Sequence, residues 1–333
     1  MKSYLWKINE EKLKATNIHL YSNFIKKNYK INAVDDFNKI WRWSIENPQI
    51  FWKSIWEFTN VKGYVGKVLL KKSKTFFKNK FFPEAKLNYA ENLLIKKTED
   101  PAIIFKSENG YRTSFSWNDL NLQVMQVSEW LKFNNIKKGD RVAAYLPNIP
   151  ETVIAYISTS VIGAIWSSCS PDFGANGVVE RFAQINPKIL IISDRYYYNG
   201  KEINVIERLP LILKKIKTIS KVIVVNYPGK KFCKFKKIKK IKYYFWNEIY
   251  KIKSYKVIFN KFDFDHELAI LYSSGTTGKP KCICHRAGGV LLQHLKEHQL
   301  HSEIKPKDNI FYFTTCGWMM WNWLVSALAS KAS

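Results

Sequence analysis

Residues 139–164 read GDRVAAYLPNIPETVIAYISTSVIGA and set the pattern for most of the chain. The first nine residues, GDRVAAYLP, predict a turn followed by a short apolar strand. The next part, PETVIAYISTSVIGA, predicts a helix that begins near Pro150, because proline fits the first turn of a helix. A strand that leads directly into a helix is the repeating unit of α/β folds.

The same alternation continues on both sides of this stretch. PAIIF (101–105) predicts a strand, and SWNDLNLQVMQVSEWLKF (116–133) predicts a helix with Ser116 and Asp119 as a capping box. PKILIISD (187–194) and KVIVVNY (221–227) are short, nearly continuous apolar runs, which is typical of strands covered on both faces. We therefore predict an α/β fold with mainly parallel sheets and helices on both faces.

The N-terminal part of the chain has a different residue pattern. Residues 1–95 are aromatic and helix-patterned, as in DFNKIWRWSIENPQIFWKSIWEF (36–58), and the pattern breaks at Pro83. The alternation of strands and helices starts after this region. We predict two parts, an N-terminal cap over residues 1–95 and a larger domain over residues 96–333.

The composition describes a globular and strongly basic protein. The chain has 333 residues, 46% of them hydrophobic and 15% aromatic, and a formal net charge of +27. Such a charge is compatible with binding to nucleic acid or to an anionic membrane, but the lysines are scattered, as they are after compositional drift on ordinary surfaces. We predict no specific nucleic-acid partner and no membrane partner.

The most basic segment is KKFCKFKKIKKIKYYF (230–245). Lysines interleaved with aromatic residues can bind single-stranded nucleic acid through phosphate contacts and base stacking. The alternative is a solvated surface strand or loop whose aromatic side chains pack inward, and we favour this alternative because no RNA-recognition motif accompanies the segment.

Cysteine usage and hydropathy favour a cytoplasmic protein. The chain has five cysteines, and its start, MKSYLWKINEEKLK, lacks the apolar core of a secretory leader, so we expect reduced thiols. Two uncharged stretches, Thr152–Pro171 and Asn309–Ser330, are long enough to span a bilayer. Both contain turn-like breaks, so we expect them to be buried helix and strand segments.

A loop rich in glycine and hydroxyl groups lies within ILYSSGTTGKPKCICH (270–285). Gly275 and Gly278 allow backbone angles that a β-carbon would forbid, and consecutive N–H groups in such a loop form an anion-binding concavity. The neighbouring hydroxyls and lysines also suit a polyphosphate. The loop is not a P-loop, because Pro280 stands where that motif requires glycine.

At residues 272–281 the sequence resembles the nucleotide motif of the acyl-adenylate-forming enzymes, and the resemblance extends over nearly the whole chain. Within that superfamily it is similar to acetoacetyl-CoA synthetases, more closely than to acetyl-CoA synthetases. The segments that carry this similarity are FFPEAKLNYAENLL (81–94), residues 139–174, ISDRYYYNGK (192–201) and FTTCGWMMWNW (313–323). One departure is Cys282, where many members have glycine.

The resemblance implies a fold and an activity. It implies the large N-terminal domain of the acyl-adenylate-forming fold over residues 96–333, preceded by a cap of acetyl-CoA-synthetase type over residues 1–95. It implies that acetoacetate reacts with ATP, in the presence of Mg²⁺, to form an acyl-adenylate, and that CoA then takes the acyl group. Two alternatives stay open: another short-chain acyl-CoA synthetase, and a basic protein that binds nucleic acid or an anionic surface.

The resemblance also assigns residues to roles. Nucleotide binding falls to Ser273, Ser274, Gly275, Thr276, Thr277, Gly278 and Lys279. Lys281 is expected to supply catalytic charge. Trp318, Met319, Met320 and Trp321 are expected beside the acyl group, although clustered aromatic and methionine side chains are often plain core. Lys201, Asp172 and Gly174 are expected along the CoA path, with a merely solvent-exposed lysine as the alternative for Lys201.

A metal site is the rival interpretation for one cluster. Cysteine and histidine are dense over residues 282–301, at Cys282, Cys284, His285, His294, His298 and His301. The cysteine spacing is unusual for zinc, and the last three histidines share one helix face that we expect to pack against the sheet. We predict no zinc site at this cluster. Because members of the family continue well beyond LVSALASKAS, we also expect the chain to be truncated and inactive alone.

Overall fold

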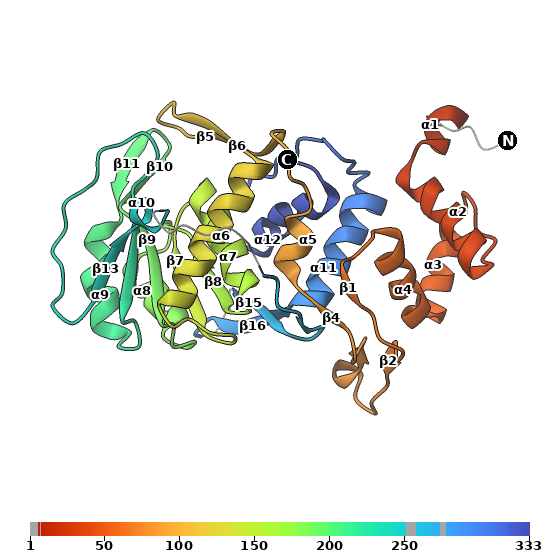
Figure 1. The fold of residues 1–333 in the computed structure, drawn as a ribbon, viewed down its shortest axis with the longest axis horizontal. Helices are drawn as coiled ribbons and strands as arrows, with labels where there is room; N and C mark the ends of the chain where they lie inside the picture. Colours follow the sequence, from red (N-terminus) through yellow and green to blue (C-terminus); the bar gives the residue numbers. More distant parts are fainter. Residues whose placement is uncertain (1–5, 7, 251–257, 274–277) are drawn as a thin grey trace.

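The computed structural model describes residues 6, 8–250, 258–273 and 278–333, and a group of helices forms one end of it (Figure 1). These helices are α1 (Glu10–Lys14), α2 (Asn17–Tyr29), α3 (Phe37–Glu46) and α4 (Pro48–Phe58). The helix-patterned aromatic stretch 36–58 forms two helices, α3 and α4. Asp36 caps α3, and Asn47 separates it from α4, which begins at Pro48.

A seven-stranded sheet is the centre of the larger part of the chain. Its strand order is β13-β12-β9-β7-β8-β15-β16. The strands are β7 (Arg141–Tyr145), β8 (Ile165–Cys169), β9 (Ile189–Ser193), β12 (Lys221–Val225), β13 (Lys242–Phe245), β15 (Glu267–Ser273) and β16 (Lys281–Arg286). Neighbouring strands are parallel except for β15 and β16, which are antiparallel. The predicted, mainly parallel α/β architecture is confirmed.

Helices cover both faces of this sheet (Figure 1). The chain leaves β7 through α7 (Pro150–Val161) to β8, then returns through α8 (Ala175–Phe182) to β9 on the other side of β7. Because the two crossovers run in opposite directions and such connections are right-handed, α7 and α8 lie on opposite faces. Helix α6 (Trp117–Phe133) packs on α7, and α9 (Leu209–Lys215) packs on α8.

Several local predictions are confirmed. Ser116 and Asp119 form the capping box of α6, and Pro150 occupies the first turn of α7. All five residues of β9 are buried, as expected for a strand covered on both faces. The stretch Thr152–Pro171 holds most of α7 and all of β8, nearly all of it buried. Within the described ranges, no helix is long and apolar enough to cross a membrane.

Short strands and helices complete the fold. One small sheet has three strands, β1 (Gly63–Tyr64), β4 (Lys86–Leu87) and β14 (Phe262–Asp263). The other small sheets are two-stranded and pair β2 (Leu70–Lys71) with β3 (Lys80–Phe81), β5 (Pro101–Lys106) with β6 (Arg112–Ser116), and β10 (Arg195–Tyr198) with β11 (Lys201–Asn204). The remaining helices are α5 (Tyr89–Leu93), α10 (Trp246–Ile249), α11 (Ala287–Lys296) with a π-helical turn (Glu297–His301), and α12 (Met319–Ser326), with 3₁₀ turns at Phe76–Lys78, Ile206–Arg208 and Ala327–Ser330. The predicted strand at 101–105 exists, but among the described strands it pairs only with β6, outside the main sheet.

The basic segment 230–245 is a loop that leads into the edge strand β13. Its aromatic side chains pack on one another, with ring centroids 5.0 Å apart for Phe232 and Phe245 and 5.4 Å apart for Phe235 and Tyr243. The buried Asp194 accepts a hydrogen bond from the backbone N–H of Cys233 at 3.2 Å. Phe235, Tyr243 and Phe245 also pack against the hydrophobic core, whereas Phe232 is 37% exposed. The segment is thus a surface loop and strand with most of its aromatic residues packed inward.

Candidate functional site

The carboxyl edge of the sheet is where the fold offers a site. Strand β7 has β8 on one side and β9 on the other, so the crossovers change direction there. In open α/β sheets, ligands bind outside the carboxyl ends of the strands at such a switch point. The loop after β8, residues 170–174, contains two of the residues predicted along the CoA path, Asp172 and Gly174.

The predicted phosphate loop is closed by a hairpin at the end of β15. Ser273 on β15 pairs with Lys281 on β16, so the two ends of the loop are held opposite each other. The backbone φ angle of Gly278 is 142°, a value that residues other than glycine rarely adopt. Lys279 and Lys281 are exposed. The other predicted nucleotide residues, Ser274, Gly275, Thr276 and Thr277, lie outside the described residues.

The turn after α8 and strand β8 anchor this hairpin. The side-chain N–H of Gln184 donates to the carbonyl of Pro280 at 2.9 Å. The hydroxyl of Ser167 lies 2.8 Å from the carbonyl oxygen of Ile270 and 3.0 Å from the hydroxyl of Tyr272. Burial raises the pKa of Tyr272, so this hydroxyl stays protonated. Sequence reasoning missed Gln184, since a glutamine in the turn after a helix carries no motif.

The segment FTTCGWMMWNW meets the carboxyl ends of β7 and β8. The thiol of Cys316 donates to the carbonyl of Leu146 at 2.8 Å, and the hydroxyl of Ser168 donates to the carbonyl of Cys316 at 2.5 Å. A β-carbon on Gly317 would lie 3.4 Å from both the ring of Phe173 and the backbone nitrogen of Ser170. This segment therefore lies directly against the loop that follows β8.

The four residues predicted beside the acyl group have different environments. Trp321 is 0% exposed, its indole N–H donates to Asn148 at 2.8 Å, and it stacks on Trp166 with ring centroids 6.4 Å apart. Met320 is half-buried, whereas Trp318 is 53% exposed and Met319 is 43% exposed. Trp321 is thus a core residue, which is the alternative that the sequence left open. Contact of any of the four residues with an acyl group stays a prediction.

Arg208 holds the loop after β8 in place. Its guanidinium donates to the carbonyls of Pro171 at 2.7 Å and Phe173 at 3.1 Å, and it also bonds the hydroxyl of Tyr145. Asp172, between the two carbonyls, accepts from the hydroxyl of Ser170 at 2.6 Å. Sequence reasoning missed Arg208, because an arginine in an ordinary helical segment carries no signal. Lys201, predicted near CoA, is exposed on β11, in the hairpin that follows β9.

The predicted histidine face lies on α11 and the π-helical turn that follows it. His294 and His298 are buried and both contact α12, and α11 also contacts strand β16 of the sheet. The Nδ1 atom of His294 lies 2.7 Å from the hydroxyl of Ser326, and the rings of His298 and Trp323 are 4.4 Å apart. No group of three histidine, cysteine, aspartate or glutamate side chains in the described part of the chain is arranged to hold a metal ion.

These buried histidines predict a loss of stability in mild acid. Burial lowers the pKa of His294 to about 3 and that of His298 to about 4. Below about pH 6.5 the unfolded chain therefore binds protons that the folded chain does not, and the free energy of unfolding falls as the pH is lowered. At ~1.4 kcal/mol per histidine and pH unit, the loss by pH 5 is about 4 kcal/mol. Denaturant titrations at pH 7 and pH 5 measure it.

Two variants show whether the buried side chains cause this loss. His298→Leu should remove about half of the pH dependence, whereas His301→Gln, at an exposed position in the same π-helical turn, should leave most of it. Equal slopes in the wild type and in His298→Leu would contradict the assignment.

Comparisons with known proteins agree with the resemblance seen in the sequence. The chain is 42% identical over 298 residues to acetoacetyl-coenzyme A synthetase of Rhizobium meliloti (strain 1021), covering 90% of this chain and 45% of that protein. It is 38% identical over 333 residues to acetoacetyl-CoA synthetase of Xenopus tropicalis, covering 96% of this chain and 49% of that protein. The chain thus spans about half the length of these curated relatives.

A solved structure and two family models complete the comparison. Acetoacetyl-CoA synthetase from Streptomyces lividans superposes with a TM-score of 0.91 at 32% identity, over 99% of this chain and 50% of that one. Residues 37–93 match the acetyl-coenzyme A synthetase N-terminus family. Residues 94–331, most of the chain, match the AMP-binding enzyme model, and the chain therefore belongs to the AMP-binding enzyme family.

Proposed function

We propose that the protein is an ATP-dependent acid–CoA ligase that activates acetoacetate as an acyl-adenylate and transfers the acyl group to CoA, releasing AMP and diphosphate. The observation that carries the proposal is the closed β15–β16 hairpin at the sheet's carboxyl edge, in a chain similar throughout to acetoacetyl-CoA synthetases. In this proposal residues 1–95 form the N-terminal cap and residues 96–333 belong to the adenylation domain. The co-substrates are ATP, bound with Mg²⁺, and CoA. The protein works in the cytoplasm.

The first step must bring two anions together. Two unit charges about 4 Å apart repel by about 1 kcal/mol in water, and by more where the medium is less polar. The backbone N–H groups and hydroxyls of residues 273–278 would surround the terminal phosphates, and Lys281 would add a positive charge. These groups offset the repulsion and stabilise charge on the departing diphosphate. Magnesium bound to the phosphates would neutralise further charge.

The second step requires the acyl group and the thiol of CoA to meet. The turn that contains Gly317 packs against Phe173, so the start of α12 lies beside the loop of residues 170–174. If Trp318 and Met319 contact the acyl group and Asp172 and Gly174 border the CoA arm, the two reactants are neighbours. Such positioning converts an encounter of two molecules into a reaction within one complex.

Acid-dependent exchange of pyrophosphate into ATP tests the proposal. The measurement uses the product of the complete reading frame that encodes residues 1–333, with acetate, acetoacetate and longer acids compared, followed by thioester formation with CoA. We expect acetoacetate to support the fastest exchange. Faster exchange with another short acid would favour the alternative acyl-CoA synthetase, and no exchange with any acid would refute the ligase assignment.

Replacing Arg208 should separate the two steps. Arg208→Leu removes charged hydrogen bonds to two loop carbonyls, each worth roughly 1.5–3 kcal/mol, so the KM for CoA should rise about tenfold or more while pyrophosphate exchange, which needs no CoA, is retained. Arg208→Lys should recover part of the loss. Arg112→Leu, at an exposed position on β6, is the control. A parallel fall in exchange and CoA use would show a structural role only.

A further inference from the structure

A hairpin in the N-terminal part presents two phenylalanines to solvent. We call residues 70–81, formed by β2, a 3₁₀ turn and β3, the aromatic finger. Phe76 at its tip is 88% exposed and Phe77 is 81% exposed. The tip is ordered by a hydrogen bond from the backbone N–H of Asn79 to the carbonyl of Phe76 at 3.0 Å, and by one from the N–H of Ser73 to the Asn79 side chain at 2.8 Å. These hydrogen bonds order the turn that carries the two exposed rings.

The residues next to these two phenylalanines in the sequence include many lysines and no acidic residues. The aromatic finger contains Lys71, Lys72, Lys74, Lys78 and Lys80. Between Glu57 and Glu84 the sequence has no aspartate or glutamate at all. In the ranges that the structure describes, none of the five finger lysines forms an ion pair. Their positive charge is therefore available to an external anionic partner.

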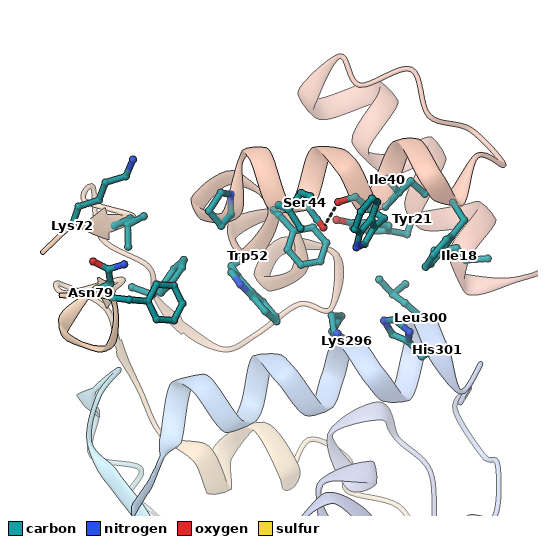
Figure 2. Close-up of a pocket in the computed structure, with 18 residues that line it drawn as sticks. Ile18, Tyr21, Ile40, Ser44, Trp52, Lys72, Asn79, Lys296, Leu300 and His301 are labelled. Carbon is teal, nitrogen blue, oxygen red and sulfur yellow. Dashed lines mark hydrogen bonds between the residues drawn. The ribbon is translucent and has the colours of Figure 1, made fainter. Parts of the chain in front are cut away.

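The apolar surface continues from the finger to helix α3. Phe76 and Lys72 line one end of a pocket of about 650 Å³ that also contacts α2, α3 and α11. Figure 2 shows Lys72 and Asn79 on the finger at one end of this pocket, and Ile18, Tyr21 and Ile40 at the other. On α3, Phe37, Trp41 and Ile45 also line the pocket, and all three are more than half exposed. Their spacing of four residues places them on one face of the helix.

We propose that the aromatic finger and the exposed face of α3 bind the surface of a bilayer that contains anionic lipids. Aromatic side chains insert at the boundary between headgroups and acyl chains, and nearby lysines are attracted to anionic headgroups. The net charge of +27 adds long-range attraction. A single-stranded nucleic acid fits this surface less well, because it needs positive charge along its whole groove, whereas Lys72 and Lys296 are the only lysines among the described residues that line the pocket. The proposal departs from the expectation of no membrane partner and is independent of the ligase assignment.

Sedimentation with vesicles tests the proposal. The product of the complete reading frame that encodes residues 1–333 is mixed with vesicles of phosphatidylcholine alone, or of phosphatidylcholine with phosphatidylglycerol, at about 0.1 M salt. Wild-type protein should sediment with the anionic vesicles only, and less of it should do so as salt is raised. Phe76→Ser/Phe77→Ser should weaken binding at least about tenfold, since each buried phenylalanine is worth ~1.5–3 kcal/mol. Lys72→Gln/Lys74→Gln/Lys78→Gln should weaken it about fivefold per lysine.

A matched variant controls for general hydrophobicity. Phe311 and Phe313 are 84% and 88% exposed in another part of the chain, so Phe311→Ser/Phe313→Ser should bind vesicles like the wild type. Circular dichroism should show all variants folded, because every substituted side chain is largely exposed. Failure of the wild type to bind anionic vesicles, equal binding by Phe76→Ser/Phe77→Ser, or an equal loss in Phe311→Ser/Phe313→Ser would overturn the proposal. Binding to transfer RNA without binding to vesicles would assign the lysines to nucleic acid and overturn it too.

Discussion

Lys281→Ala is expected to slow acetoacetate-dependent ATP–pyrophosphate exchange by about two orders of magnitude, as loss of one preorganised charge-stabilising group does in other enzymes. Lys281 stands opposite Ser273 where the β15–β16 hairpin closes the predicted phosphate loop. Its side chain is exposed, and its backbone lies at the carboxyl edge of the sheet because it pairs with the last residue of β15. Initial exchange rates at saturating acid and ATP measure the effect.

A second lysine distinguishes a local effect from a change in overall charge. Lys242 is exposed at the start of the edge strand β13, and Lys242→Ala removes the same charge away from the loop. Exchange in Lys242→Ala should match that of the wild type. Wild-type exchange in Lys281→Ala would remove this lysine from the mechanism.

Trp321→Ala should lower the free energy of unfolding by about 3–5 kcal/mol, the cost of deleting a large buried aromatic side chain. The indole is fully buried against Trp166 and Tyr156, and its N–H donates to Asn148. The substitution leaves a cavity and also leaves the side chain of Asn148 without this donor. Denaturant unfolding followed by circular dichroism measures the loss.

Trp318→Ala is the counterpart of this variant at the start of α12. Trp318 is about half exposed, so its removal should change stability by no more than about 0.5 kcal/mol. If it contacts the acyl group, the ratio of rates with acetoacetate and with longer acids should change. A stability loss in Trp318→Ala as large as that in Trp321→Ala, or no loss in Trp321→Ala, would contradict this division between an exposed and a core tryptophan.

Local structure was largely predictable from short-range patterns. The capping box at Ser116, the start of α7 at Pro150 and the buried strands β9 and β12 follow from spacing and residue type within a few positions. The phosphate-loop interpretation likewise rests on neighbouring residues. Such signals work because a helix terminus or a covered strand imposes its requirements on residues that are close in sequence.

Contacts between distant segments were not predictable in this way. Nothing in the run 101–105 indicates that it pairs outside the main sheet, and the helical spacing of His294 and His298 shows a common face without naming α12 as its partner. Gln184 and Arg208 anchor loops by donating hydrogen bonds to backbone carbonyl groups. Because every residue has a backbone carbonyl, the identity of the accepting residue gives no sign of the contact in the sequence.

The sequence by itself determined the α/β class, the loop rich in glycine and hydroxyl groups after residue 273, and the resemblance to acyl-adenylate-forming enzymes. Only the tertiary structure decided that Trp321 is core while Trp318 is exposed, and that Phe76 and Phe77 form the tip of a basic hairpin. The reason is physical. Backbone preferences act between neighbours along the chain, whereas the burial of a side chain depends on which distant segments pack over it.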